Sequence, residues 1–287
     1  MWIADTWTDY EVLDASSGEK LERWGDYYLV RPDPQVIWQT EKNNPLWIHP
    51  NGHYHRSSKG GGSWEMKNLP ETWQITWRDL TFHLKPFAFK HTGLFPEQAA
   101  NWDWFRSKLK KRGGQVKVLN LFAYTGGATC AALAEGASVT HVDASKGMVT
   151  WAHENAESSG LGSSAVRWLV DDCTKFVQRE IRRGNRYDAI IMDPPSYGRG
   201  PKGEVWKIED TVYPLIQLAA QLLSDTPLFF LLNSYTTGLQ SGVLTYMLSS
   251  ALGGRHPSSV VSDEIGLPVS ESGLVLPCGC SGRVSWD

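Results

Sequence analysis

The sequence contains no hydrophobic run long enough to cross a membrane. A transmembrane helix needs about 20 consecutive apolar residues, and the first residues, MWIADTWTDYEVLD, lack the basic and apolar regions of a signal peptide. Cysteine is also scarce, and the four cysteines are too scattered for a disulfide framework: Cys130, Cys173, Cys278 and Cys280. These absences predict a cytoplasmic protein with no membrane partner.

A large excess of one charge is missing as well. The formal net charge is −3, which gives no general attraction to polyanions, so nucleic-acid binding would depend on local basic patches. One patch is KLKKR at 108–112, and the other consists of Arg179, Arg182, Arg183 and Arg186. Both patches also fit solvated helix faces. The oligomeric state is left open by the sequence.

The pattern of elements changes near residue 113. Before it, the short segments YYLVRP, QVIWQT, WQITWRD and TFHLKPFAF predict strands of a small, mostly β domain. After it, apolar strands alternate with helices, which predicts an α/β fold with a doubly wound, mostly parallel sheet. Two strands near the C-terminus are expected to close this sheet as an antiparallel pair. The expected domains are 1–85, a connecting segment 86–112 that closes over a cofactor, and 113–287.

The first apolar strand of the α/β part leads into a glycine turn, in VLNLFAYTGGAT. Ligands of open α/β sheets bind outside the carboxyl ends of the strands, where glycine lets the backbone approach the ligand. The turn has neither the third glycine of G-x-G-x-x-G nor a Walker lysine, so phosphate binding is disfavoured. A tight connection without a ligand also fits the turn alone.

Acidic residues end the next two strands. Asp143 ends the second strand, where a carboxylate can accept hydrogen bonds from both hydroxyls of a ribose. In WLVDDCTKF, Asp172, or failing that Asp171, is placed to accept from an adenine amino group; an aspartate here also fits a helix cap. Together with the glycine turn, these acids predict a nucleoside cofactor.

The fourth strand ends in Asp193-Pro194-Pro195, within IIMDPPSYGRG. The prolines fix φ and donate no hydrogen bond, so carbonyl groups and the carboxylate are held as acceptors. Such preorganised polar groups are typical of a reacting centre.

VLNLFAYTGGAT, VDAS, DDCTKF and DPPSYGRG together resemble class I S-adenosylmethionine-dependent methyltransferases, in particular the bacterial 23S rRNA methyltransferases that act on cytosine C5 or guanine N7. The resemblance covers about residues 82–234 and implies a Rossmann-like methyltransferase sheet. KHTGLFPEQA is similar to a K-T-G-(aromatic)-x-x-D-Q-R segment of that family, with the arginine absent here. The contact that this arginine makes in the family is therefore in doubt for this chain.

The resemblance also assigns roles to individual residues. The methionine part of S-adenosylmethionine is expected against Ala123, Tyr124, Thr125, Gly126 and Gly127. The ribose is expected against Asp143, Ala144 and Ser145, the adenine against Asp172 and Cys173, and a closing segment over the cofactor at Phe95 to Gln98. The methyl group is expected to meet its acceptor at the catalytic residues Asp193, Pro194, Pro195, Ser196 and Tyr197.

A nucleophilic cysteine is missing where the cytosine-modifying relatives carry one. Cytosine C5 reacts only after a thiolate adds to C6, but the place after the fifth strand reads FLLNSYTTG. Ser234 is a poor substitute for the thiolate, because its alkoxide is far too basic to form without a strong base. The sequence thus favours methylation of an rRNA nucleobase at a nitrogen such as guanine N7. The alternatives are cytosine C5 methylation using Cys278 or Cys280, a small-molecule or protein substrate, and a cofactor-binding module without catalysis.

An RNA base would have to be flipped out or single-stranded to reach such a site. Tyr197 and Trp206 are candidates to stack on it, although Trp206 fits a packing role equally well, and Arg199 and Lys202 are candidates for phosphate contacts. No metal is expected, because the histidines of HPNGHYHR lack cysteine or carboxylate partners at ligand spacing: His49, His53 and His55.

Overall fold

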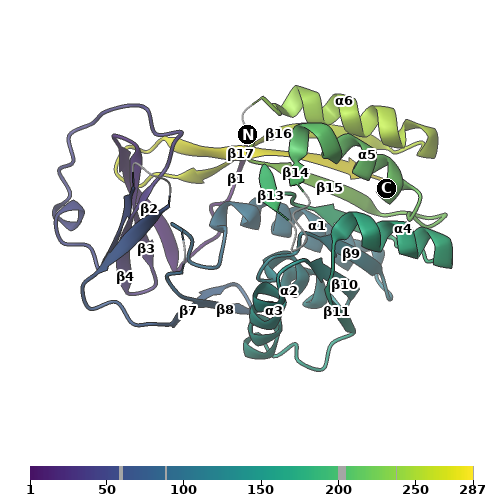
Figure 1. Cartoon of the computed structure of the whole chain (residues 1–287), viewed down its shortest axis with the longest axis horizontal. Coiled ribbons are helices and arrows are strands. Elements are labelled where there is room, and N and C mark those ends of the chain that lie inside the picture. Colours follow the sequence, from purple (N-terminus) through teal and green to yellow (C-terminus); the bar gives the residue numbers. More distant parts are fainter. Residues whose placement is uncertain (58–60, 88, 200–204, 237, 287) are drawn as a thin grey trace. The chain divides into compact units, whose positions relative to one another are not determined.

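The computed structural model describes residues 1–57, 61–87, 89–199, 205–236 and 238–286. The chain forms two compact units (Figure 1). The first unit contains Met1–Trp2, Asn101–Ile265 and Cys278–Asp287, and the second contains Ile3–Ala100 and Gly266–Pro277. Each unit therefore combines segments from the two ends of the sequence.

A mostly parallel sheet forms the centre of the first unit. Its order within the described residues is β1-β16-β17-β15-β12-β9-β10-β11. Neighbours among β15, β12, β9, β10 and β11 pair in parallel, and β17 pairs antiparallel with β15. The predicted doubly wound sheet with an antiparallel closing strand is confirmed. The strands are β1 (Trp2–Ile3), β9 (Lys117–Leu121), β10 (Ser138–Asp143), β11 (Val166–Val170), β12 (Ala189–Met192), β15 (Phe229–Ser234), β16 (Ser259–Pro268) and β17 (Val275–Ser285).

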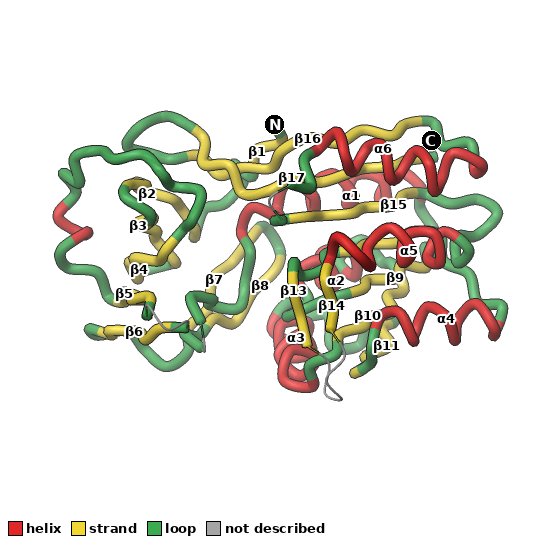
Figure 2. Tube along the Cα trace, turned by 45° about the horizontal axis from the view of Figure 1, so that its top comes forward, coloured by secondary structure: helices red, strands yellow, loops and turns green. Residues whose placement is uncertain are grey.

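Helices cover both faces of this sheet (Figure 2). One face packs against α4 (Cys173–Arg183), α5 (Ile208–Ala220) and α6 (Ser241–Leu252), and the other carries α1 (Ala99–Arg112), α2 (Gly127–Leu133) and α3 (Lys146–Ser158). A short helix, η3 (Gly253–Arg255), follows α6. Burial of aliphatic and aromatic side chains stabilises the α4–α6 face, with a core that includes Phe176, Leu215, Ile216, Leu244 and Leu248.

The second unit contains two small sheets. The larger has the order β2-β3-β4-β5-β6, antiparallel except for the β4–β5 pair, and the smaller is the hairpin β7–β8. Its elements are β2 (Tyr10–Ser16), β3 (Glu19–Trp24), β4 (Tyr27–Pro32), η1 (Pro45–Trp47), β5 (Gly52–Arg56), β6 (Gly62–Met66), β7 (Trp73–Trp77), β8 (Leu80–Leu84) and η2 (Pro96–Gln98).

The predicted strand QVIWQT is wrong, because residues 35–40 form no strand. Val36 O and Trp38 O accept hydrogen bonds from Gly18 N (2.7 Å) and Ser17 N (2.8 Å). The segment thus lies against the tight turn between β2 and β3, which is too short to continue a strand ladder. Alternation of apolar and polar residues could not reveal that its neighbour is a turn.

None of the helices in the described ranges combines the length and the apolar composition that a membrane crossing requires.

A fully buried histidine lies beneath the start of α2. His141 Nδ1 and Thr129 Oγ1 are 2.9 Å apart, and Thr129 Oγ1 accepts a hydrogen bond from Asn120 (2.9 Å). His141 Nε2 has no hydrogen-bond partner in the described part of the chain. Burial lowers the pKa of His141 from 6.5 to about 3, so the folded protein keeps this side chain neutral.

We expect the free energy of unfolding to decrease as the pH falls below about 6.5, by up to about 1.4 kcal/mol per pH unit from His141 alone. The reason is that the unfolded chain binds a proton which the folded chain, with its lower pKa, does not bind until about pH 3. The free energy of unfolding, measured by urea denaturation at several pH values, should depend less steeply on pH for His141→Gln than for the wild type. His153→Gln, at a half-exposed site on α3, is the control, and equal slopes for both variants would contradict the expectation.

Candidate active site

The turn after β9 has an unusual backbone. Phe122 and Tyr124 have φ of 56° and 51°, in the left-handed region that non-glycine residues seldom occupy, and Gly126 has φ of 83°. Asn155 on α3 donates a hydrogen bond to Thr125 O (2.8 Å) and holds the turn. Backbone strain of this kind persists where the surrounding structure enforces it, often at ligand sites.

The two glycines of the turn are required by neighbouring helices. A Cβ on Gly126 would lie 2.8 Å from Ala152 Cβ of α3, and a Cβ on Gly127 would lie 2.6 Å from Trp102 of α1. The sequence suggested close approach of a ligand as the reason for these glycines. In the structure, α3 and α1 leave no room for a Cβ at either position, and Gly126 in addition has a positive φ. The approach of a ligand to this turn stays a prediction.

Asp143 connects the first two strand ends. Its Oδ2 accepts a hydrogen bond from Tyr124 N (2.9 Å) and its Oδ1 accepts one from Ser145 N (2.8 Å). Burial raises the pKa of the Asp143 carboxyl, and these two N–H groups oppose the increase. Because each carboxylate oxygen has two lone pairs, both oxygens retain acceptor capacity for a ligand. Ala144 and Ser145 follow as exposed residues, and Ser145 caps α3.

The third strand end is occupied by a helix cap. Asp172 Oδ1 accepts a hydrogen bond from Lys175 N (2.8 Å) at the start of α4, and Asp171 forms an ion pair with Arg179. The capping alternative of the sequence is therefore observed for Asp172. Cys173 is buried; Phe122 N donates to its Sγ (3.3 Å), and burial raises the pKa of this thiol.

The Asp193 corner is fixed by contacts from three segments. Asn233 Nδ2 donates to Asp193 Oδ1 (2.8 Å), and Trp206 Nε1 donates to Pro195 O (2.6 Å). The hydroxyls of Ser196 and Thr236 lie 2.6 Å apart. Pro194 is buried, whereas Pro195 and Ser196 are exposed. The corner is thus rigid on its inner side and accessible on its outer side.

A small hairpin follows the corner, formed by β13 (Tyr197–Arg199) and β14 (Val205–Lys207). Trp206 packs its ring against Phe122, with centroids 5.0 Å apart. Together with its bond to Pro195 O, this contact supports the packing role of Trp206 over base stacking. Tyr197 is 51% exposed. Lys202 and the side chain of Arg199 lie outside the described part of the structure.

All four cysteines are buried. Cys280 Sγ donates to Leu239 O (3.0 Å), and burial raises the pKa of Cys280 to about 11 and that of Cys130 to about 12. The Cys280 side chain belongs to the apolar core on the α4–α6 face. Thiols in such surroundings are poor nucleophiles at neutral pH.

The segment expected to close over the cofactor belongs to the second unit. Pro96, Glu97 and Gln98 form the buried helix η2, and the Phe95 ring lies 5.4 Å from the His91 ring. Burial raises the pKa of Glu97 and lowers that of His91 to about 4. The closing role of this segment stays a prediction.

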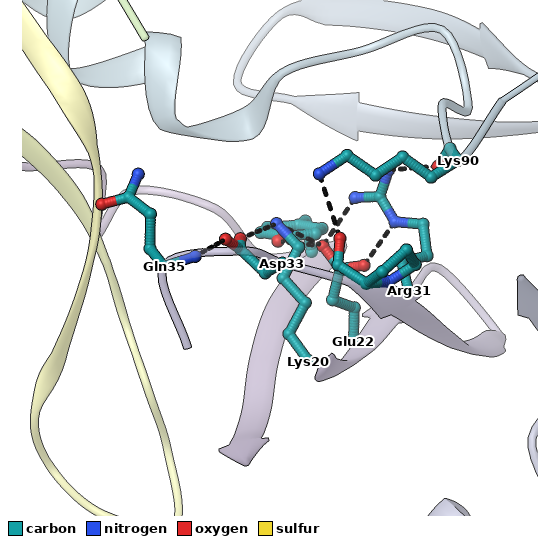
Figure 3. Close-up of polar contacts among 8 residues, drawn as sticks. Lys20, Glu22, Arg31, Asp33, Gln35 and Lys90 are labelled. Carbon is teal, nitrogen blue, oxygen red and sulfur yellow. Dashed lines mark hydrogen bonds and ion pairs between the residues drawn. The ribbon is translucent and has the colours of Figure 1, made fainter. Parts of the chain in front are cut away.

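A buried ion cluster anchors the chain just before this segment (Figure 3). Arg31 makes two hydrogen bonds to Glu22 (2.6 and 2.7 Å) and one to Lys90 O (3.0 Å). Lys20 Nζ lies 3.5 Å from Glu22 Oε1 and from Asp33 Oδ2, and Figure 3 shows these side chains side by side. Lys90 donates to Pro32 O (3.0 Å), and burial lowers its pKa to about 8. Sequence reasoning missed this cluster. Glu22 and Arg31 are only nine positions apart on the neighbouring strands β3 and β4, but the contact with Lys90 joins positions 59 apart.

Two histidines of HPNGHYHR each pair with a different carboxylate. His53 Nε2 lies 2.7 Å from Glu19, and His55 Nε2 lies 3.1 Å from Glu65. His53 and His55 on β5 thus form separate polar pairs near the surface.

Comparison with known proteins identifies the class of enzyme. The profile of the S-adenosylmethionine-dependent methyltransferase family matches residues 17–237. The chain therefore belongs to this family and uses S-adenosylmethionine as its cofactor. The crystal structure of an S-adenosylmethionine-dependent methyltransferase from Agrobacterium tumefaciens is 34% identical with a TM-score of 0.92, and the match covers 98% of this chain and 91% of that one.

Curated relatives include ribosomal RNA methyltransferases. Ribosomal RNA large subunit methyltransferase K of Neisseria meningitidis is 28% identical over 68% of this chain and 51% of its own length. Ribosomal RNA large subunit methyltransferase K/L of Magnetococcus marinus is 29% identical over 63% of this chain and 25% of its own length. The matches thus span about half or less of these relatives.

Proposed function

We propose that the protein methylates a nucleobase of large-subunit ribosomal RNA in the cytoplasm, at a nitrogen such as guanine N7. The observation that carries this proposal is the Asp193-Pro194-Pro195 corner, a fixed set of acceptors at a strand end with no reactive thiol among the four described cysteines. The names of the ribosomal RNA methyltransferases to which the chain is similar support the substrate class.

The strand ends of the first unit fit S-adenosylmethionine. Asp143 retains acceptor capacity suited to the ribose hydroxyls, and the strained backbone of Ala123 to Gly127 offers polar groups for the amino acid part. We assign the adenine to the neighbourhood of Asp172 and Cys173. When bound, S-adenosylmethionine supplies an electrophilic methyl group, so the protein mainly has to orient the acceptor.

Asp143→Ala is expected to abolish measurable S-adenosylmethionine binding. The substitution removes the acceptors for the ribose and also releases the N–H groups of Tyr124 and Ser145, so the turn loses its anchor. Isothermal titration calorimetry measures the affinity. Ser164→Ala, in the loop after α3, serves as a control, and an unchanged affinity of the Asp143 variant would refute the ribose assignment.

The kind of atom that accepts the methyl group follows from the absence of a reactive thiol among the described cysteines. A nitrogen with a lone pair, such as guanine N7, needs no covalent activation, whereas cytosine C5 requires a thiolate. The buried cysteines do not meet that requirement, since Cys280 donates to a backbone carbonyl and its pKa is raised to about 11. The corner would therefore act by positioning an acceptor that is already nucleophilic.

Replacing Cys278 and Cys280 together by Ser should leave turnover within about twofold of the wild type. Neither thiol has a role in a reaction at nitrogen, and a buried Cys→Ser change mainly costs stability. Methyl transfer to RNA from radiolabelled S-adenosylmethionine measures the rate. A folded but inactive double variant would restore cytosine C5 methylation as the better proposal.

The exposed Tyr197 ring beside the corner is suited to stack on a flipped or single-stranded base. Aromatic stacking accepts any base, so specificity would come from the polar groups of the corner. Asp193 Oδ1 and Pro195 O are held there by hydrogen bonds from Asn233 and Trp206.

The decisive experiment is mass spectrometry of nucleosides from the ribosomal RNA of cells that lack the gene and of cells that regain it. We expect 7-methylguanosine to be depleted without the gene and restored with it. A change in 5-methylcytidine would replace the proposed acceptor atom. An unchanged RNA, with methyl transfer to a metabolite or protein in cell extract instead, would refute the RNA substrate.

A further inference from the structure

A chain of buried polar side chains leads from Asp193 through the first unit to Arg283. Asn233 Nδ2 lies 2.8 Å from Asp193 Oδ1, and Asn233 Oδ1 lies 2.7 Å from Ser281 Oγ. Asn101 Nδ2 lies 2.8 Å from Ser281 Oγ, and Asn101 Oδ1 lies 3.0 and 2.9 Å from Nε and Nη2 of Arg283. Asn101, Asn233, Ser281 and Arg283 are each at most 6% exposed.

The direction of every hydrogen bond in this chain is set by Arg283. A guanidinium only donates, so the group of Asn101 that faces it must be the carbonyl oxygen, which leaves the Asn101 amide N–H to donate to Ser281. The Ser281 hydroxyl then donates its own hydrogen to Asn233 Oδ1. As a result, Asn233 can present only an N–H group to Asp193, and a flipped amide would place like groups against each other at two contacts.

Arg283 is held so that it can impose this order. Its guanidinium lies 3.6 Å from the centroid of the Trp2 ring and 5.1 Å from that of Trp104, contacts that stabilise a cation. Burial lowers the pKa of Arg283 to about 9, which leaves the group charged at neutral pH.

The strand register places this series of hydrogen-bonded side chains next to Asp193. Asn233 and Ser281 are directly opposed across β15 and β17, and Met192 is opposed to Leu232 across β12 and β15. The residues that follow, Asp193 and Asn233, are therefore neighbours where β12 ends. Asp193 is only partly buried, so this series of buried hydrogen bonds ends at a carboxylate that is partly accessible to solvent.

We propose that Asn233 is a positioning residue that fixes the orientation of the Asp193 carboxylate, and that the relay Ser281–Asn101–Arg283 fixes the orientation of Asn233. The catalytic consequence rests on the proposed function, because that function places Asp193 at the methyl acceptor. A donor-only partner also favours the charged form of the carboxyl group, since hydrogen bonds to a charged group stabilise that form. Asp193 would thus act as an oriented acceptor for an N–H group of the base, which specifies a base with such a group.

The test compares the wild type with Asn233→Leu, which is close in size but has no N–H group. Protein labelled with ¹³C at the aspartate carboxyl carbons is titrated by NMR, with the Asp193 signal assigned by its absence from Asp193→Asn. We expect the midpoint of the Asp193 titration to rise by about one pH unit in Asn233→Leu. The rate of methyl transfer should fall about tenfold or more, with the affinity for S-adenosylmethionine unchanged.

Ser281→Ala provides a second variant if Asn233→Leu does not fold. It leaves Asn233 in place but frees its amide to rotate, so the midpoint should shift in the same direction by a smaller amount. Ser285→Ala is the matched control, at a buried serine four positions further along β17. It should change neither midpoint nor rate.

Two outcomes are decisive. An Asp193 midpoint that stays unchanged in every variant that folds would overturn the positioning role and leave the relay a purely structural feature. A shifted midpoint supports it even if the wild type transfers no methyl group to RNA, because the titration needs no substrate. The latter result would refute the proposed function alone.

Discussion

Asp193→Ala should lower methyl transfer by at least about 10²-fold while leaving S-adenosylmethionine bound with wild-type affinity. The carboxylate lies at the end of β12, held by Asn233 on one side and followed by two prolines. In the proposed reaction, its removal takes away an acceptor that is oriented before the substrate arrives, and misplacement by about 1 Å can cost as much as 10²-fold in rate. Single-turnover rates and calorimetry separate the two effects.

Asp193→Asn distinguishes charge from shape at the same position. It preserves the size of the side chain and, with its carbonyl oxygen turned toward Asn233, the hydrogen bond from that residue, but it removes the charge and replaces the second acceptor oxygen by an NH2 donor. A large loss of rate is therefore expected here too. Asp263→Ala is the control, since Asp263 pairs with the N-terminal amine at the surface. Full activity of Asp193→Ala would show that the carboxylate is not part of the reacting centre.

Glu22→Gln should destabilise the protein by about 3–5 kcal/mol. Glu22 is fully buried and receives two hydrogen bonds from Arg31 and one from Tyr10 (2.7 Å). Without its charge, Arg31 would remain buried without a compensating carboxylate at these distances, and removal of one partner of a buried ion pair carries the full cost of that desolvation. Urea denaturation measures the change.

Glu19→Gln, on the same strand, provides a matched comparison. Glu19 pairs with Lys42 (2.8 Å) and His53 (2.7 Å) near the surface, where an ion pair contributes about 0–1 kcal/mol. Similar losses in the two variants would contradict the assignment of Glu22 as a buried anchor. Replacing Glu22 and Arg31 together by Leu and Met should recover part of the loss, because Arg31 no longer leaves an unpaired buried charge, whereas Tyr10 still loses its acceptor.

The contribution of Glu22 to the free energy of unfolding depends on pH in a defined direction. Burial by itself would raise the pKa of Glu22, but Arg31 and Lys20 outweigh burial and lower it from 4.5 to about 2. The stabilisation is therefore complete above about pH 4.5 and is lost as the pH falls toward 2. The Glu22→Gln variant should lose less stability than the wild type over this range.

The sequence was informative where a signal is local. Apolar runs that end in an acid, a glycine turn or a proline pair predicted the strands and the residues at their carboxyl ends. The sheet and the cofactor class are confirmed, and the roles of the strand-end residues stay predictions. Each of these signals lies within about a dozen residues, the range over which periodicity and turn chemistry can be recognised.

Contacts between distant segments could not be predicted in this way. Asn101 and Ser281 are 180 positions apart, and nothing near either residue indicates that they meet. The left-handed conformation of Phe122 and Tyr124 was missed for a related reason. Neither residue type favours that conformation, so only the surrounding fold explains it.

The exchange of segments between the two units has a consequence for biosynthesis. Ala4 N donates to Gly266 O, and Ser270 N donates to Val12 O (2.9 and 3.0 Å), so the second unit is completed by residues near the other end of the sequence. Domains usually fold in the order in which they leave the ribosome. Here the unit that is translated first must wait for residues 266–277, and the nascent chain therefore spends most of its synthesis with the edge of β2 unpaired.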